Sequence, residues 1–126
     1  MPSKEKTMHT VKDFDETVLT SLQQLGGVQL ARRMLELFLE HTPKRIEAVR
    51  TGLQDGDMEL VVRSAHSLKS TAGHLRILAI QDLAGHIEQL AMDEQRDALS
   101  EPIQDLEAAF ARVSPIIEKH RSDLDT

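Results

Sequence analysis

The sequence contains no cysteine, no tryptophan and no tyrosine. Without cysteine the chain can form neither a disulfide framework nor a thiolate metal site. Three phenylalanines are its only aromatic residues, which leaves few side chains on which single-stranded nucleic acid could stack. The formal net charge of −6 also argues against nucleic acid or an anionic membrane as the main partner.

Long apolar runs are missing as well. No stretch approaches the ~20 apolar residues of a membrane span, and the first residues, MPSKEKTMHTVKD, lack the apolar core of a signal peptide. We therefore expect a cytoplasmic protein that does not contact a membrane. A chain of 126 residues is long enough to fold as one domain around a single core.

The distribution of apolar residues divides the chain into three parts. Residues 1–12 have no periodic apolar pattern and are expected to form a flexible leader. The apolar periodicity then predicts a helical bundle over residues 13–120. The polar end of the chain, residues 121–126, is expected to be a frayed tail.

The predicted bundle begins at the sequence DFDE, which contains residues typical of a helix N-terminus. Asp13 can cap a helix and Glu16 occupies the return position of a capping box. The helix that they start is expected to be short, because Gly26 and Gly27 follow soon after.

A second helix is expected over about residues 28–54, where apolar residues repeat on one side. Pro43 lies inside it and predicts either a kink or a restart capped by Thr42. Gly56 is expected to close this helix, and Asp57 is a good N-cap for the next.

The third helix is expected over about residues 58–75, and its apolar residues recur at four-three spacing, as in a bundle seam. They are Val61, Ala65, Leu68, Ala72 and Leu75. A fourth helix begins near Ile77, and a last one carries Pro102 in its first turn and Pro115, expected to bend it, near its end. No segment shows strand alternation. The fold class predicted is all-α, an antiparallel four-helix bundle with a short additional N-terminal helix, expected to be monomeric.

His66 does not belong to the seam of the third helix. On a helical wheel it lies roughly 140° from the centre of the apolar arc, so its ring is predicted to face water. Its neighbours at helical spacing include Arg63, Lys69 and Ser70, and two cations beside an imidazole favour its neutral, nucleophilic form. Gly73 on the same face suggests that something approaches the backbone closely. An ordinary solvated basic face is the alternative at this point.

The segment RSAHSLKSTAGHL, preceded by LQDGDMELVV and followed by a helix ending IEQLA, resembles the histidine-containing phosphotransfer (HPt) domain of two-component phosphorelays. The family pattern is His-x-Leu/Ile-Lys and a small residue, here His66, Leu68, Lys69 and Ser70. The resemblance extends over about residues 14–117. One departure is Arg76, which stands where many members have glycine.

The resemblance implies a phosphorelay intermediate. His66 would accept a phosphoryl group from an aspartyl phosphate on a receiver domain and pass it to another receiver, and Lys69 would steady that group. The receiver, of a response regulator or a hybrid sensor histidine kinase, would dock against Val62, Arg63, Ser70, Gly73 and His74. It would also bring the Mg²⁺, so no cofactor is expected in this chain. No Gly-rich phosphate loop is present, so autokinase activity is not expected either.

Three other interpretations compete with a relay. A metal site is disfavoured because no H-E-x-x-H occurs, and His66 and His74 fall about 80° apart on the wheel. The dimerisation helix of a sensor kinase usually has an acidic residue after its histidine, whereas Ser67 follows here. The main alternative is a non-catalytic helical adaptor that docks a receiver or another partner through the His66 face.

Overall fold

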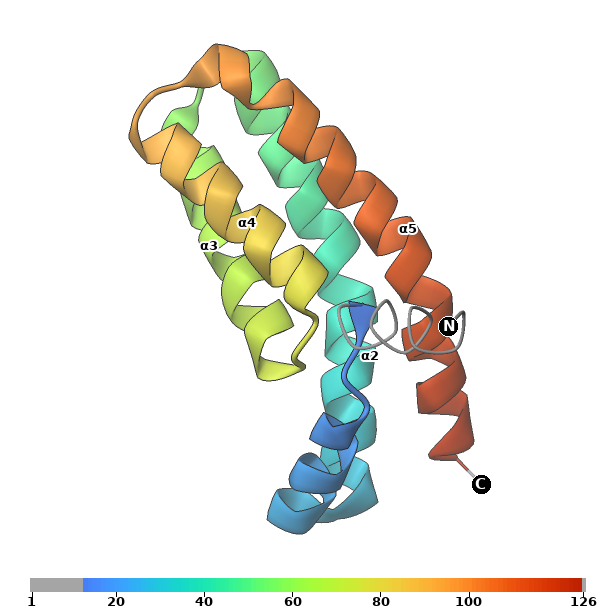
Figure 1. Ribbon diagram of the computed structural model, residues 1–126. Coiled ribbons are helices and arrows are strands. Elements are labelled where there is room, and N and C mark those ends of the chain that lie inside the picture. Colours follow the sequence, from blue (N-terminus) through green and yellow to red (C-terminus); the bar gives the residue numbers. More distant parts are fainter. Residues whose placement is uncertain (1–12, 126) are drawn as a thin grey trace, which may run out of the picture.

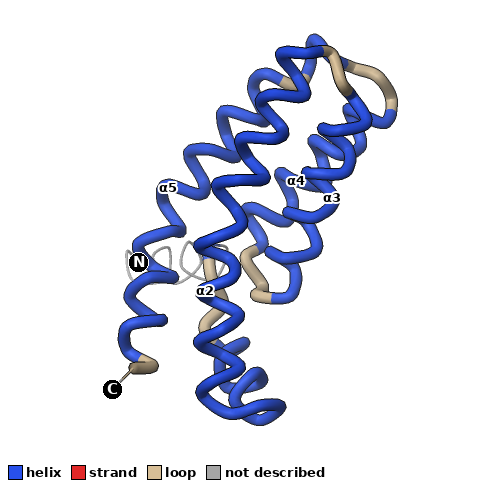
Figure 2. The backbone as a smooth tube through the Cα atoms, turned by 180° about the vertical axis from the view of Figure 1, so that it is seen from behind, coloured by secondary structure: helices blue, strands red, loops and turns tan. Residues whose placement is uncertain are grey.

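The computed structural model describes residues 13–125 of the chain. Its elements are α2 (Thr17–Asp55), α3 (Met58–His74), α4 (Leu78–Met92), the 3₁₀ turn η1 (Arg96–Ala98) and α5 (Ser100–Asp123). Within these residues there is no strand, which confirms the all-α prediction. In Figure 1, α3 and α4 form a short pair that lies beside the longer α2 and α5, and Figure 2 shows the same arrangement from behind.

Helix α2 is interrupted near its start by a glycine pair. Gly26 (φ −147°, ψ 19°) and Gly27 (φ 74°, ψ −175°) have non-helical backbone, and the positive φ of Gly27 suits a residue without a Cβ. The chain reverses there, so that residues 17–25 fold back beside the beginning of residues 28–55 (Figure 1). The short helix predicted before the glycine pair is therefore confirmed, and the four longer helical segments make up the bundle.

The predicted capping box at the N-terminus is wrong. Glu16 stands at the cap position but makes no side-chain cap bond. Asp15 accepts instead, through Oδ1, from the backbone N–H of Thr17 at 3.1 Å and from its hydroxyl at 2.6 Å. Asp13 is nearly buried, and both its oxygens accept from Nε of Arg112 on α5 at 3.0 Å. A guanidinium distant in the sequence competes successfully for the carboxylate expected to cap the helix.

The prolines do not end the helices that contain them. Helix α2 continues through Pro43, its non-helical backbone being confined to the glycine pair. Of the two expected outcomes, a kink or a restart, the restart is therefore wrong. Thr42 is 1 % exposed and packs in the core instead of capping a new helix. Helix α5 likewise continues past Pro115, and Pro102 lies in its first turn as expected.

The turn between α2 and α3 follows the local signals of the sequence. Gly56 has φ 71° and closes α2, and Asp57 Oδ1 accepts from the N–H of Leu60 at 3.1 Å at the start of α3. Both predictions are confirmed. Just before the turn the helices approach closely, because a Cβ built on Gly52 would lie 2.7 Å from Cγ2 of Val61.

One continuous apolar core joins the helices. The five seam residues predicted for α3 are all buried, as are Leu35 and Phe38 of α2. Helices α4 and α5 contribute Ile80, Ala84, Ile87, Ile103, Leu106, Val113 and Ile117. The apolar stripe of α3 packs into this core, so the opposite side of the helix faces solvent.

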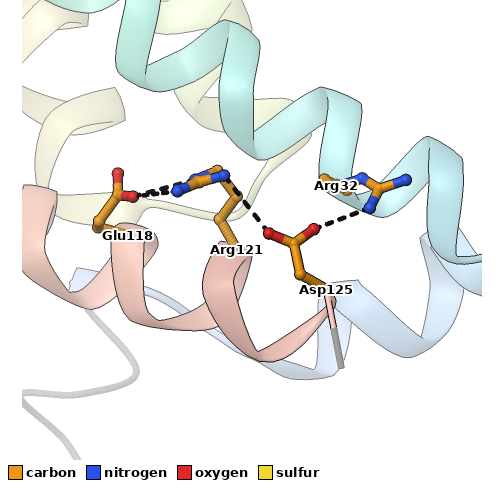
Figure 3. Close-up of polar contacts among 4 residues, drawn as sticks. All are labelled: Arg32, Glu118, Arg121 and Asp125. Atoms are coloured by element: carbon orange, nitrogen blue, oxygen red, sulfur yellow. Dashed lines mark hydrogen bonds and ion pairs between the residues drawn. The ribbon is translucent and has the colours of Figure 1, made fainter.

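The C-terminal end of the described chain is tied to α2. Helix α5 extends past the predicted boundary at residue 120 to Asp123. Beyond it, Asp125 accepts from Arg32 Nη1 of α2 at 2.8 Å and pairs with Arg121, which also binds Glu118 (Figure 3). Residues 121–123, which the sequence analysis places in the tail, are thus helical, and Asp125 pairs with two arginines.

Candidate functional site

His66 lies in the middle of α3 with 63 % of its side chain exposed. The prediction that its ring faces water is confirmed. The backbone beneath it is anchored by Ala65 and Leu68, which are fully buried within the core on either side of it in the sequence. The histidine is therefore presented on a rigid support.

A carboxylate from the neighbouring helix contacts the ring. Nδ1 of His66 lies 2.7 Å from Oε2 of Glu88 on α4. The other oxygen of the same carboxylate, Oε1, accepts from Nζ of Lys69 at 2.6 Å. Glu88 thus bridges the two α3 residues, which are three positions apart and share a helix face.

The charge state of Glu88 determines which nitrogen of the ring carries hydrogen. The hydrogen bond from Lys69, and after it the one from His66, hold the pKa of Glu88 below its ordinary value, although partial burial acts in the opposite direction. The carboxylate is therefore ionised near neutral pH and can only accept. Nδ1 must donate, so in a neutral imidazole Nε2 carries the lone pair.

A glycine on α4 gives Lys69 its path to Glu88. A Cβ built on Gly85 would lie 3.3 Å from Cδ of Lys69, so the lysine stem crosses α4 directly over this residue. Gly85 and Glu88 are one helical turn apart and lie on the same side of α4. The side chain of Lys69 is 39 % exposed, so it remains partly open to solvent.

The other residues predicted to surround His66 occupy two kinds of position. Arg63, Ser70 and His74 are exposed on α3, and Val62 is half-buried against the core. The close approach expected at Gly73 comes from within the chain, because a Cβ there would lie 3.1 Å from Nε2 of Gln81 on α4. The packing of α3 against α4 is thus sufficient to explain a glycine at position 73.

Glu88 is the site residue that sequence reasoning did not find. It lies in the segment IEQLA, which the resemblance used only as the end of a leucine-rich helix. The available signal was its register: Gln81, Gly85 and Glu88 recur at four-three spacing beside the buried stripe of α4. That spacing places them toward α3, but only the packing of the two helices shows what they meet.

Two other features are absent from residues 13–125. No group of three histidine or acidic side chains in this range could hold a metal ion. None of its helices is both long and apolar enough to cross a membrane.

The site is thus an exposed histidine on a four-helix bundle, oriented by a carboxylate and flanked by a lysine. Residues 33–115 match the family model of the Hpt domain, and the chain belongs to that family. Hpt domains are phosphotransfer modules and not kinases, so membership supports a histidine phosphotransfer role in phosphorelays. No curated protein sequence matches the chain.

Two solved structures share the fold. Histidine-containing phosphotransfer protein B of Pseudomonas aeruginosa PAO1 aligns with a TM-score of 0.82 at 22 % identity, over 88 % of this chain and 96 % of that one. The HPT domain of the Hpt sensor hybrid histidine kinase of Shewanella aligns with a TM-score of 0.78 at 19 % identity, over 92 % and 99 %. At these identities the likeness concerns the fold.

Proposed function

We propose that His66 is the phosphoacceptor of a relay, taking a phosphoryl group from a receiver-domain aspartyl phosphate and passing it to another receiver aspartate. The observation that carries this proposal is the bond between His66 and the ionised Glu88, which leaves Nε2 of an exposed ring as the free nucleophile. A buried ring, or one bonded through Nε2, would not serve.

The proposed transfer needs only the groups of this chain and the aspartates of the two receivers. The Nε2 lone pair of His66 attacks phosphorus while the bond from phosphorus to the aspartate oxygen breaks, and the aspartate leaves as a carboxylate. The proton on Nδ1 stays there. The ring gains positive charge as the new bond forms, and Glu88 stabilises that charge through the same hydrogen bond. The return step reverses these changes on the second receiver.

Lys69 neutralises charge on the phosphoryl oxygens. Phosphoryl transfer depends on positioning and charge stabilisation more than on covalent chemistry by the protein. An ammonium group has three donors, and the bond to Glu88 uses one. The other two donors are proposed to bind the oxygens of a phosphoryl group on His66. The Mg²⁺ is assigned to the receiver, so this chain needs no cofactor.

The receiver is proposed to dock on the face of α3 around the ring. Arg63, Ser70 and His74 offer exposed polar groups, and Val62 and Gly73 contribute less accessible surface between them. The acceptor and donor domains are proposed to use this one surface in turn, since a single histidine must meet both aspartates.

The experiment incubates the protein with a radiolabelled phospho-receiver and, separately, with labelled ATP alone. The expected result is an acid-labile, base-stable label from the receiver and none from ATP. His66→Gln should abolish labelling, and His86→Gln, which removes another exposed histidine, should retain it. Binding of the receiver without any transfer would favour the adaptor instead, and labelling by ATP alone would point to an autokinase.

A further inference from the structure

A second polar site lies between α2 and α3. A cavity of about 270 Å³ opens to the surface there, lined by His41, Lys44, Arg45 and Ala48 of α2 and by Ser64 of α3. Ser64 and His66 are two residues apart and therefore point to nearly opposite sides of α3. The cavity is thus separate from the relay face.

The lining of this cavity is basic, although the chain as a whole is acidic. His41, Lys44 and Arg45 recur at three-four spacing and share one side of α2. No acidic residue lines the cavity. Glu40 and Glu47 flank this stretch in the sequence; Glu40 lines a different cavity with Glu36 and Arg121, and Glu47 is exposed. The lining itself therefore carries cations and no carboxylate.

One donor in this group is left without an acceptor. Nε of Arg45 is buried and has no hydrogen-bond partner within the described part of the chain. Buried polar atoms are nearly always paired, so an orphan among them requires a specific explanation. Arg45 therefore carries a donor that no group of the described residues satisfies, and a guanidinium that lines a cavity can bind an oxyanion through several N–H groups at once.

We propose that this cavity binds an oxyanion of the phosphate class, either free phosphate or the phosphate group of a nucleotide. Arg45 supplies a planar set of donors, Lys44 a point charge and Ser64 a hydroxyl from the opposite helix. Donors supplied by two helices suit a tetrahedral ion with four oxygens better than a carboxylate with two. The site is independent of the transfer proposed for His66.

The test follows backbone amide NMR shifts of the full chain during titration with sodium phosphate, at constant pH and with ionic strength balanced by sodium chloride. Saturable shifts are expected at residues 41–48 and 61–65. Arg45→Gln should weaken binding about tenfold, the loss expected for one charge-assisted hydrogen bond. Arg33→Gln removes an exposed cation from the same helix outside the cavity and should leave the affinity within about twofold.

A second variant and a titration with AMP complete the test. Lys44→Gln, an exposed change, should also weaken binding and replaces Arg45→Gln should that variant not fold. AMP that binds more tightly than phosphate would assign a nucleotide, and equal affinities would assign the phosphate group alone. Shifts that do not saturate, that centre on residues 66–69, or that weaken equally in Arg33→Gln and Arg45→Gln would overturn the proposal.

Discussion

His66 and Glu88 are joined by a hydrogen bond of 2.7 Å from Nδ1 to Oε2, which crosses from α3 to α4. Through the second oxygen of Glu88 the same carboxylate holds Lys69. The nucleophile, its orienting group and the cation are therefore one connected unit. A change in any of the three should alter phosphoryl transfer while the bundle around them stays folded.

Removing the charge of Glu88 should slow transfer. Glu88→Gln keeps an oxygen that can accept from Nδ1 but no longer stabilises the positive ring, so the rate from a saturating phospho-receiver should fall on the order of tenfold. Rapid-quench kinetics measure this rate, and Glu101→Gln on α5 is the matched control. An unchanged rate in Glu88→Gln would remove the carboxylate from the mechanism.

The stability of the protein should depend on Glu88 in acid. The pKa of Glu88 in the folded protein lies below its ordinary value of 4.5, chiefly because Lys69 donates to it. Its contribution is therefore present in full above about pH 4.5 and is lost as the pH falls through the lower, folded-state pKa. Urea unfolding should show a difference in stability between wild type and Glu88→Gln that is present above pH 4.5 and shrinks below it. A difference that grew in acid would reverse the assigned sign.

Lys69→Ala should slow phosphoryl acceptance and leave the fold intact. The lysine is partly exposed and its stem lies over Gly85, so its loss removes charge but opens no cavity in the core. Circular dichroism should be unchanged, and the transfer rate should fall on the order of tenfold, the effect of losing one charge-assisted bond. Lys119→Ala on α5 should retain the wild-type rate. Unfolding of Lys69→Ala would show that the side chain supports the structure instead.

Gly52→Ala should destabilise the bundle by about 1–3 kcal/mol, because the new methyl group would overpack the contact between α2 and α3. It would lie 2.7 Å from Val61 Cγ2 and 3.0 Å from the carbonyl oxygen of Asp57. Gly85→Ala is the control, since its nearest neighbour is the flexible stem of Lys69 at 3.3 Å and alanine favours helix. Urea denaturation of both variants measures the difference, and equal stabilities would contradict the close approach of the helices.

Patterns confined to one helix were predictable from the sequence. The four-three spacing of α3 fixes both the buried seam and the outward direction of His66, because both follow from the helical period alone. Gly56 and Asp57 likewise cap helices by hydrogen bonds with the backbone of nearby residues, and the structure confirms both predictions.

Contacts between distant residues were not predictable in the same way. Asp13 pairs with Arg112, which lies near the other end of the chain, and nothing in the sequence DFDE indicates that this guanidinium binds the carboxylate. Glu88 meets His66 only through the packing of α4 on α3. Arg76 keeps φ 55°, the left-handed backbone that glycine adopts readily, and its side chain donates to Thr17 Oγ1 at 3.2 Å. Arg76 thus adopts at this turn a backbone conformation that residues with side chains seldom take.

The central claim concerns one atom, Nε2 of His66. The most direct test is ¹⁵N and ³¹P NMR of the protein after phosphorylation by a phospho-receiver, with selectively labelled histidine. One phosphorylated ring is expected, at His66, with phosphorus on Nε2 and hydrogen retained on Nδ1. Phosphorus on Nδ1, or on any other residue while His66 stays unmodified, would contradict it.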